Sequence, residues 1–162
     1  LWIGTEGGGL NYYNRRTREF KWYRPQEGRN SISHNNVKAL YYDADKEIIW
    51  IGTHLGGLNK LDIRSGHFTH YRMEEGNPNT LPSDIIRDII PYKSLLIIAT
   101  QNGVCLFDPA NGQCQQLFKD SKEGKSIKMV ADVTFDSEGT LWIAATGEGV
   151  FSYRFNTCKL PP

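Results

Sequence analysis

Several residue patterns that would assign a protein to a common functional class are missing from this 162-residue sequence. No apolar run approaches the roughly 18 residues that a membrane-crossing helix needs. The formal net charge of +1 provides no electrostatic attraction to nucleic acid or to an anionic membrane surface. The three cysteines are an odd number and lack the spacing of metal ligands. We therefore expect no cofactor, no metal ion, and no contact of this segment with nucleic acid or membrane.

Disulfide bonds are not expected either. Cys105 and Cys114 fall on two adjacent predicted strands. If Asp108 pairs with Gln113, then Phe107 faces Cys114 and Cys105 is offset by two residues. Such a diagonal pair is about 7–8 Å apart, beyond the usual reach of a disulfide. We expect free, packed thiols, and the redox state of the three cysteines (Cys105, Cys114 and Cys158) is left open.

Catalytic patterns are also scarce. Residues 7–9 are three glycines, but no Lys-Ser or Lys-Thr follows them and a strand is expected next, which excludes a phosphate-binding loop. Acidic residues are scattered mainly through turns, whereas a glycosidase needs two carboxylates about 5–10 Å apart. Residues 134–142 loosely resemble the Asp-box hairpin of sialidase propellers, which is itself a structural element. We expect that this segment is not an enzyme.

What the sequence does contain is an internal repeat of about 46 to 48 residues. Leu-Trp-Ile-Gly-Thr at residues 1–5 returns as Ile-Trp-Ile-Gly-Thr at 49–53, without Trp at 96–100, and in looser form at 141–146. A glycine follows each copy with spacings of 48, 46 and 46, at Gly9, Gly57, Gly103 and Gly149. Self-similarity at this period is typical of propellers and solenoids.

Each repeat predicts four short antiparallel strands, which we name a to d. In the last copy, residues 130–135 alternate as strand a, a Gly-ended turn follows, and 141–146 and 150–154 form strands b and c. The fold class is therefore all-β, with four-stranded propeller blades, about three and a half in number. The expected repeat units are residues 1–36, 37–84, 85–129 and 130–162.

One segment locally favours a helix. Residues 83–90 place apolar side chains at i, i+1, i+4 and i+5, with Ser83 or Asp84 as a possible N-cap. However, this segment is level with residues 37–42 in the repeat, and Pro91 would end a helix early. We predict a strand.

The tryptophans of the repeat are expected to pack between blades. Trp2, Trp50 and Trp142 occupy equivalent positions, and a buried large aromatic side chain contributes about 4–6 kcal/mol. Stacking against a carbohydrate is the alternative. Small residues on strand b would let neighbouring blades approach closely, namely Gly4, Gly52, Ala99 and Ala144.

The linkers between strand d and the next strand a repeat as well. Residues 30–37 are Asn-Ser-Ile-Ser-His-Asn-Asn-Val, residues 79–85 match them, and 125–130 match weakly. Combined with Ile-Trp-Ile-Gly-Thr at 49–53 and Gly-Gly-Leu-Asn at 56–59, they closely resemble the two-component regulator propeller repeat. The resemblance extends from Leu1 to about Arg154 and is weaker in the third unit, where Trp is absent.

This resemblance implies a function. Such repeats typically form two seven-bladed propellers, followed by a β-sandwich, a membrane helix and a histidine kinase, in hybrid two-component systems of gut Bacteroidetes. It implies a periplasmic sensor of oligosaccharides, within an inner-membrane protein. We expect a fragment of a larger seven-bladed propeller that contacts other blades of its parent chain. We also expect it to self-associate through exposed end faces. The alternatives are a protein-interaction scaffold and, less favoured, a propeller lyase or glycosidase.

Candidate ligand residues follow from blade geometry, since the b–c turns and d–a linkers of a propeller open on one face and such loops commonly carry function. Polar side chains there suit a polyhydroxylated ligand. The candidates are Glu6, Arg29, His34, Asn36 and His54, with Asn35, Gln101, Asn102 and Glu148 nearby. In the alternative, Asn30, Ser31 and Asn36 only satisfy turn backbone, and the others are exposed without contacting a ligand.

Trp22 is a further candidate because it departs from the repeat. Its counterparts are His70 and Gln116 or Leu117. A tryptophan on an outer strand is either an interface or stacking residue, or it is buried against a neighbouring domain.

Overall fold

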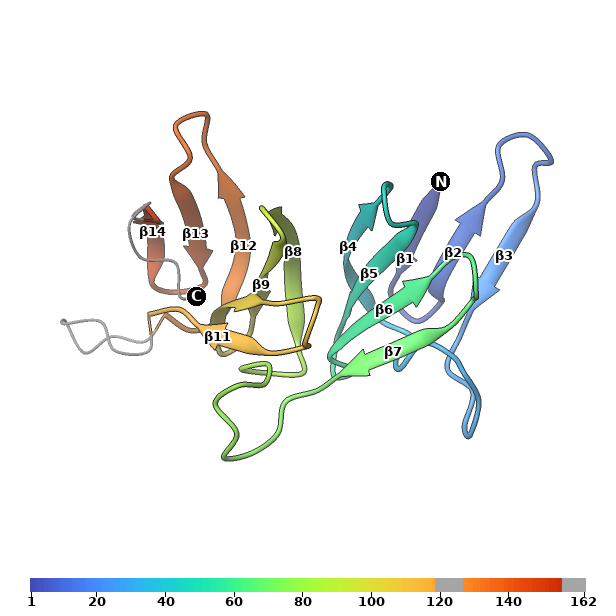
Figure 1. Cartoon of the computed structure of the whole chain (residues 1–162), viewed down its shortest axis with the longest axis horizontal. Helices are drawn as coiled ribbons and strands as arrows, with labels where there is room; N and C mark the ends of the chain where they lie inside the picture. The colour runs from blue at the N-terminus through green and yellow to red at the C-terminus, as the bar shows by residue number, and fades with distance from the viewer. Residues whose placement is uncertain (119–126, 156–162) are drawn as a thin grey trace.

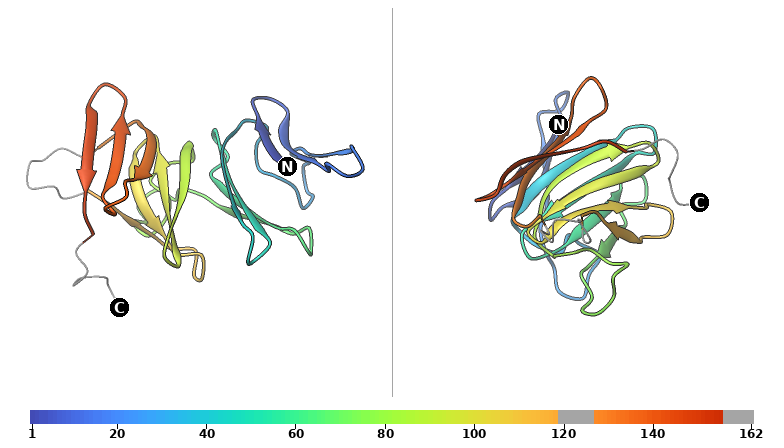
Figure 2. Two further views of the ribbon diagram at one scale, coloured as in Figure 1. Left: turned by 90° about the horizontal axis from the view of Figure 1, so that it is seen from above. Right: turned by 90° about the vertical axis from the view of Figure 1, so that its left-hand side faces the viewer.

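The computed structural model describes residues 1–118 and 127–155, which form fourteen β-strands. The strands make four separate antiparallel sheets that lie beside one another in an arc (Figures 1 and 2). No helix long and apolar enough to cross a membrane occurs in these two ranges. The expected all-β propeller architecture is confirmed.

We number the sheets as blades 1 to 4 in chain order. Blades 2 and 3 have four strands each, and blades 1 and 4 have three strands each in the described part of the chain. Blade 1 contains β1 (Trp2–Thr5), β2 (Gly9–Tyr13) and β3 (Phe20–Tyr23) as strands b, c and d. Blade 2 contains β4 (Val37–Asp43), β5 (Ile48–Thr53), β6 (Leu58–Asp62) and β7 (Phe68–Tyr71). Blade 3 contains β8 (Ile86–Tyr92), β9 (Leu95–Thr100), β10 (Gly103–Phe107) and β11 (Cys114–Gln116). Blade 4 contains β12 (Val130–Phe135), β13 (Leu141–Ala145) and β14 (Gly149–Tyr153) as strands a, b and c.

The repeat is visible in the strand register. Each strand a has one shift in its pairing register with strand b. The shift lies between Val37 and Ala39 in β4 and at the corresponding places in β8 and β12. The helix-like segment is confirmed as a strand from Ile86 onward, in β8, which pairs with β9 along its length, whereas residues 83–85 precede the strand. Pro91 fits because β8 is an edge strand of its sheet and one side needs no ladder donor.

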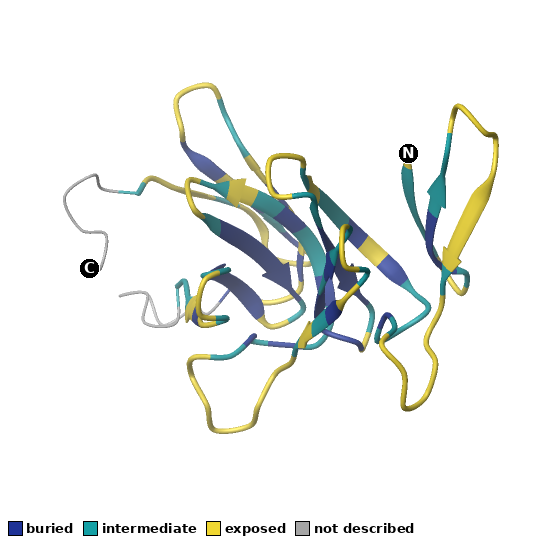
Figure 3. Cartoon of the chain, turned by 45° about the vertical axis from the view of Figure 1, so that its right-hand side comes forward, coloured by how far each residue is buried: buried dark blue, intermediate teal, exposed yellow. Residues whose placement is uncertain are grey.

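The core consists of three apolar layers, one between each pair of neighbouring blades. Alternation directs Ile97 toward blade 4 and its neighbour Ile98 toward blade 2. Figure 3 shows that buried residues concentrate in the two central blades, whereas β3 at the N-terminal end is mostly exposed.

The tryptophans of the repeat differ in burial according to whether a neighbouring blade covers them. Trp50 is 2% exposed and packs on Phe107 of blade 3, with ring centroids 5.4 Å apart. Trp2 is half-buried against the layer that blade 2 shares with blade 1. The expectation is wrong for Trp142, which is 41% exposed because no described blade follows on its side.

Glycine on strand b allows the close approach of blades that the sequence predicts. A Cβ added at Gly52 would lie 2.5 Å from Cγ2 of Ile86 in the next blade. A Cβ added at Gly4 would lie 2.5 Å from Cγ1 of Val37. Both contacts are shorter than van der Waals distance, so a larger residue would push the blades apart.

The two described cysteines are free and buried, as expected. Phe107 faces Cys114 and the Asp108 amide donates to Gln113, which is the predicted register. A hydrogen bond with Cys114, followed by burial, raises the pKa of the Cys105 thiol. Cys158 lies outside the described residues.

Candidate functional site

The b–c turns and d–a linkers lie together on one face of the arc, and main-chain hydrogen bonds join them. The Gly9 amide in blade 1 donates to the Asn35 carbonyl at 2.8 Å, and the His54 amide in blade 2 donates to the Asn36 carbonyl at 2.9 Å. The end of the linker is thereby held between the turns of two consecutive blades. The same pair of bonds recurs at the next junction, from Gly57 to Asp84 and from Gln101 to Ile85.

Three of the predicted site residues meet at the junction of blades 1 and 2. The Asn36 side-chain oxygen accepts the Gly7 amide at 2.7 Å. The Asn36 amide donates to Nδ1 of His34 at 3.1 Å, so a neutral His34 carries its proton on Nε2. Nδ1 of His54 is buried without a hydrogen-bond partner among the described residues, and so is Oδ1 of Asn35.

The electrostatic environment keeps the His34 side chain uncharged near neutral pH. Burial, followed by the nearby His54 and Arg72, lowers the pKa of His34. His34 is therefore a neutral imidazole at physiological pH, with one donor and one acceptor nitrogen. Such a group can hydrogen-bond a neutral hydroxyl-bearing molecule.

The remaining candidates lie elsewhere. Glu6 is exposed and forms an ion pair with Lys38 at 3.3 Å. Arg29 is exposed in the linker, where its guanidinium contacts only Gln26, at 3.3 Å, among the described side chains. The structure therefore does not bring Arg29 to the histidines.

Trp22 lies on the open side of blade 1. It is 61% exposed and stacks on Phe20 with ring centroids 6.1 Å apart. A groove of about 400 Å³ runs along this side, and its walls include Glu6, Asn11, Phe20 and Trp22. We call it the blade-1 groove, and it brings Glu6 and Trp22 together, apart from the histidines.

Some polar residues of this face are structural. Asn30 donates from Nδ2 to the Gly66 carbonyl at 2.9 Å and accepts the Phe68 amide at 2.7 Å. This agrees with the alternative in which the linker asparagine satisfies backbone groups.

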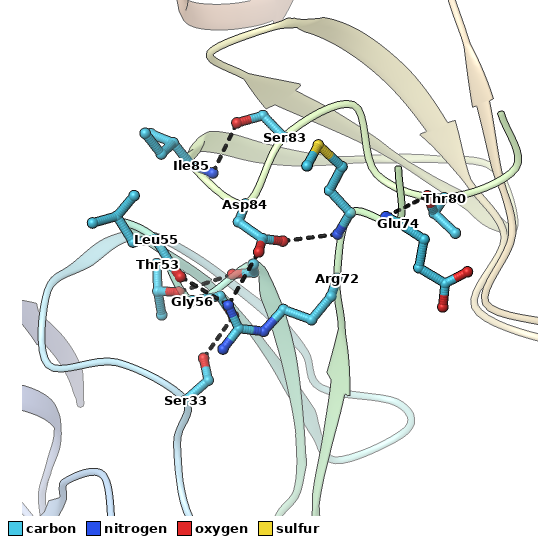
Figure 4. A network of polar contacts seen from close by, with 12 residues as sticks. Ser33, Thr53, Leu55, Gly56, Arg72, Glu74, Thr80, Ser83, Asp84 and Ile85 are labelled. Carbon is cyan, nitrogen blue, oxygen red and sulfur yellow. Dashed lines mark hydrogen bonds and ion pairs between the residues drawn. The ribbon is translucent and has the colours of Figure 1, made fainter. Parts of the chain in front are cut away.

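Sequence reasoning missed a polar network at the next junction (Figure 4). Arg72 donates to the Leu55 carbonyl at 2.8 Å and forms an ion pair with Asp84 at 3.1 Å. The other Asp84 oxygen accepts the Met73 amide at 2.8 Å. The repeat alignment, which places Arg24 and Arg72 at one position, could have indicated this site.

The first junction lacks that network for a covalent reason. Asn35 occupies the position of Asp84, and Pro25 occupies the position of Met73. Proline has no amide hydrogen, so the Asn35 oxygen loses the donor that Asp84 uses. The missing amide hydrogen explains why Oδ1 of Asn35 has no partner among the described residues. The first junction therefore has fewer internal polar bonds than the second.

Comparison with known proteins supports the interpretation of the repeat. Residues 31–54 match the model of the two-component regulator propeller. The structure aligns with the extracellular domain assigned to the hybrid two-component system BT3049 of B. thetaiotaomicron, at a TM-score of 0.82 and 23% identity, over 94% of this chain and 21% of that one. It aligns with the corresponding domain of BT4673 from the same organism at a TM-score of 0.70 and 26% identity, over 95% of this chain and 21% of that one.

A more distant likeness extends to another organism. Sqt1 of Saccharomyces cerevisiae aligns at a TM-score of 0.65 and 12% identity, over 96% of this chain and 41% of that one. No curated protein matches the sequence. The chain spans about a fifth of the two bacterial structures, and the predicted resemblance to the two-component regulator propeller is confirmed.

Proposed function

We propose that the chain is a segment of the extracytoplasmic sensor propeller of a hybrid two-component system, because residues 31–54 match the model of the two-component regulator propeller. The likeness to extracellular domains of such systems supports this proposal. It implies a periplasmic location within an inner-membrane protein. The segment's role is then to bind a signal molecule rather than to catalyse a reaction.

We assign the ligand contact to the face where the b–c turns and d–a linkers meet, at His34, Asn36 and His54. The observation that carries this assignment is the buried Nδ1 of His54, which has no partner among the described residues. A buried polar atom without a partner costs free energy, and a ligand hydroxyl would recover it once the side chains that cover Nδ1 move aside. The neutral imidazole of His34 beside the Asn36 side chain fits a hydroxyl-bearing ligand such as an oligosaccharide better than an anion or cation.

Calorimetric titration of the protein's complete extracytoplasmic region with a panel of oligosaccharides tests the proposal. We expect one glycan to bind without turnover. His54→Gln should weaken its affinity about three- to tenfold, the value of one neutral hydrogen bond. His67→Gln is the matched control, because His67 is exposed in the c–d turn of the same blade.

Three results would contradict the proposal. If no oligosaccharide of a broad panel binds, a protein partner or an accessory protein that presents the sugar would be favoured. Turnover of the glycan would favour an enzyme. Equal affinity of the His54→Gln variant and the unaltered protein would place the ligand elsewhere on the propeller.

The expected self-association of the isolated segment stays a prediction, which light scattering of the purified chain checks.

A further inference from the structure

A cleft of about 490 Å³ opens between blades 2 and 3, which both have four strands. It lies at the end of the strands that carries the a–b and c–d turns, opposite to the candidate ligand face. Its volume is within the range of about 300–1,000 Å³ that small-molecule sites occupy. Its floor is apolar, and charged side chains of both blades surround it. The residues that line it include Ile48, Trp50, Lys60, Leu95 and Asp108.

At the preceding junction, between blades 1 and 2, larger side chains occupy the corresponding positions. Tyr12 is opposite Trp2 in blade 1, and their ring centroids are 4.7 Å apart. Ile63, in the c–d turn of blade 2, packs on the same apolar layer as Trp2. Arg64, the next residue, forms an ion pair with Glu47 of the neighbouring a–b turn. An aromatic and an aliphatic side chain therefore pack beside Trp2, and the charges of the two turns are paired with each other.

Between blades 2 and 3 the same positions carry smaller or charged residues. Lys60 is opposite Trp50, at the position that Tyr12 has in blade 1. Pro109 and Ala110 follow the aspartate of the c–d turn, where blade 2 has isoleucine and arginine. All of these residues of blades 2 and 3 line the cleft. The cleft is therefore a consequence of substitutions within two complete blades.

The indole of Trp50 lacks the carboxylate partner that the same position has in blade 4. There the Trp142 indole donates to Oδ2 of Asp136 at 2.8 Å. The corresponding aspartate of blade 2, Asp43, instead accepts the Lys46 amide at 3.2 Å and the Lys46 ammonium at 3.0 Å. Within the described part of the chain the Trp50 indole donates no hydrogen bond, and its nitrogen is not one of the fully buried polar atoms without a partner. The indole N–H therefore reaches the cleft and is available to a carboxylate.

The charges around the floor suit a zwitterion. The Lys60 ammonium lies 6.0 Å from the centre of the Trp50 ring and forms no ion pair with a described carboxylate. Oδ1 of Asp108 accepts the Ala110 amide at 2.8 Å. Asn14 forms the same turn bond in blade 1 with a neutral amide, so the turn does not require the charge of Asp108. A plain carboxylate would meet Asp108 as a like charge, whereas a zwitterion pairs with both blades.

We propose that this cleft is a second binding site, which takes a free α-amino acid with a large apolar side chain. The ligand carboxylate accepts a hydrogen bond from the Trp50 indole, as an aspartate does in blade 4, and pairs with the Lys60 ammonium. The ligand ammonium pairs with Asp108, and the apolar side chain packs on Ile48 and Leu95. This inference is independent of the proposed oligosaccharide, which binds at the opposite end of the strands.

Nuclear magnetic resonance of the isotope-labelled full chain tests the proposal with L-phenylalanine as the probe. We expect the Trp50 indole N–H signal to shift saturably, with a dissociation constant in about the millimolar range because the ligand has few atoms. The indole of Trp142, which already donates to an aspartate at the other end of the chain, is the internal control and should not shift.

Two analogues and two protein variants separate the charges. L-Phenylalaninamide lacks the carboxylate and phenylpropionate lacks the ammonium, and each should bind about five- to tenfold weaker because one charge-assisted contact, partly exposed to water, is lost. Lys60→Gln and Asp108→Asn should each weaken L-phenylalanine by a similar factor, and the asparagine keeps the turn acceptor. Lys21→Gln is the matched control, because Lys21 also lies over an aromatic ring, 4.8 Å from the centre of Tyr23, but outside the cleft.

Three outcomes would overturn the proposal. The first is an unmoved Trp50 signal at saturating probe. The second is equal binding of phenylpropionate and L-phenylalanine, which would show that the cleft takes a plain carboxylic acid. The third is equal affinity of Lys60→Gln and Lys21→Gln, which would remove the cation from the site. None of these outcomes bears on the oligosaccharide proposal, which is measured by glycan binding and the His54→Gln variant.

Discussion

The central and terminal blades contain the same motif in different surroundings. Trp50 and Trp142 occupy one position of the repeat, yet Trp50 is buried between blades 2 and 3 and Trp142 is exposed at the end of blade 4. The strand that carries each tryptophan has the same pairing to its neighbours in the sheet. The motif therefore determines the blade, and the adjacent blade determines whether its apolar face is buried.

The two linker junctions make the comparison sharper. Between blades 2 and 3, Arg72 and Asp84 connect the linker to the b–c turn by an ion pair and hydrogen bonds. Between blades 1 and 2, Asn35 and Pro25 replace two members of that network, and buried polar atoms are left without partners in the described chain. We infer that the second junction is built for rigidity and that the first keeps groups available for a ligand.

The largest expected effect separates the two tryptophans. Trp50→Ala should destabilise the chain by about 3–5 kcal/mol because it leaves a cavity between two blades. Trp142→Ala should cost less than about 1 kcal/mol, since the side chain is exposed and its main polar contact is a 2.8 Å bond to Asp136. Urea unfolding followed by circular dichroism measures both, and equal losses would contradict the comparison.

The junctions should differ by a smaller amount. Asp84→Ala removes an acceptor of two hydrogen bonds and should cost about 1–3 kcal/mol. Asn35→Ala removes an oxygen that has no partner in the described chain and should be nearly neutral. The same unfolding measurement applies, and a larger loss for Asn35→Ala than for Asp84→Ala would contradict the assignment of rigidity.

The strands of the sequence were predictable because each blade repeats the others. Residues 83–90 resemble a helix in isolation, and only their alignment with residues 37–42 identified β8. The gathering of His34, Asn36 and His54 followed from the loop geometry of a propeller blade. Burial of Trp142 could not be judged from the motif, because it depends on a neighbouring blade. The network at Asp84 was only partly indicated, because the repeat aligns Arg24 with Arg72 but the network also requires a donor amide at Met73 that Pro25 cannot supply.

A carboxylate pair distinguishes the junction of blades 3 and 4. Burial, followed by interactions with Asp132, raises the pKa of Asp88, whereas blade 2 has Ala39 at that position. A carboxyl whose pKa is raised by folding costs stability above that pKa and costs none when protonated. Asp88→Asn should therefore stabilise the chain by about 0.5 kcal/mol at neutral pH, after allowance for solvent screening.

The pH dependence provides the check on this prediction. The gain from Asp88→Asn should disappear as pH falls through the raised pKa of Asp88. Thermal unfolding at neutral and acidic pH measures it. A variant that is less stable at neutral pH, or whose gain persists in acid, would show that Asp88 is paired favourably instead.

The smallest effect concerns His34 at the first junction. Its lowered pKa means that the unfolded chain binds a proton first as pH falls below the ordinary histidine value of about 6.5. Stability is therefore lost on acidification through that window, down to the pKa of folded His34. His34→Gln should lose less stability between about pH 7.5 and pH 5.5 than the unaltered chain. Identical losses of stability in the variant and the unaltered chain would show that His34 does not contribute to the pH dependence of stability.

Solvent access to the four indole groups is the most direct test of the claim that neighbouring blades, and not the motif, determine burial. A soluble paramagnetic agent added to the labelled chain broadens each tryptophan N–H signal according to its exposure. We predict strong broadening for Trp22 and Trp142, a smaller effect for Trp2, and little for Trp50. Equal protection of Trp142 and Trp50 would contradict the account.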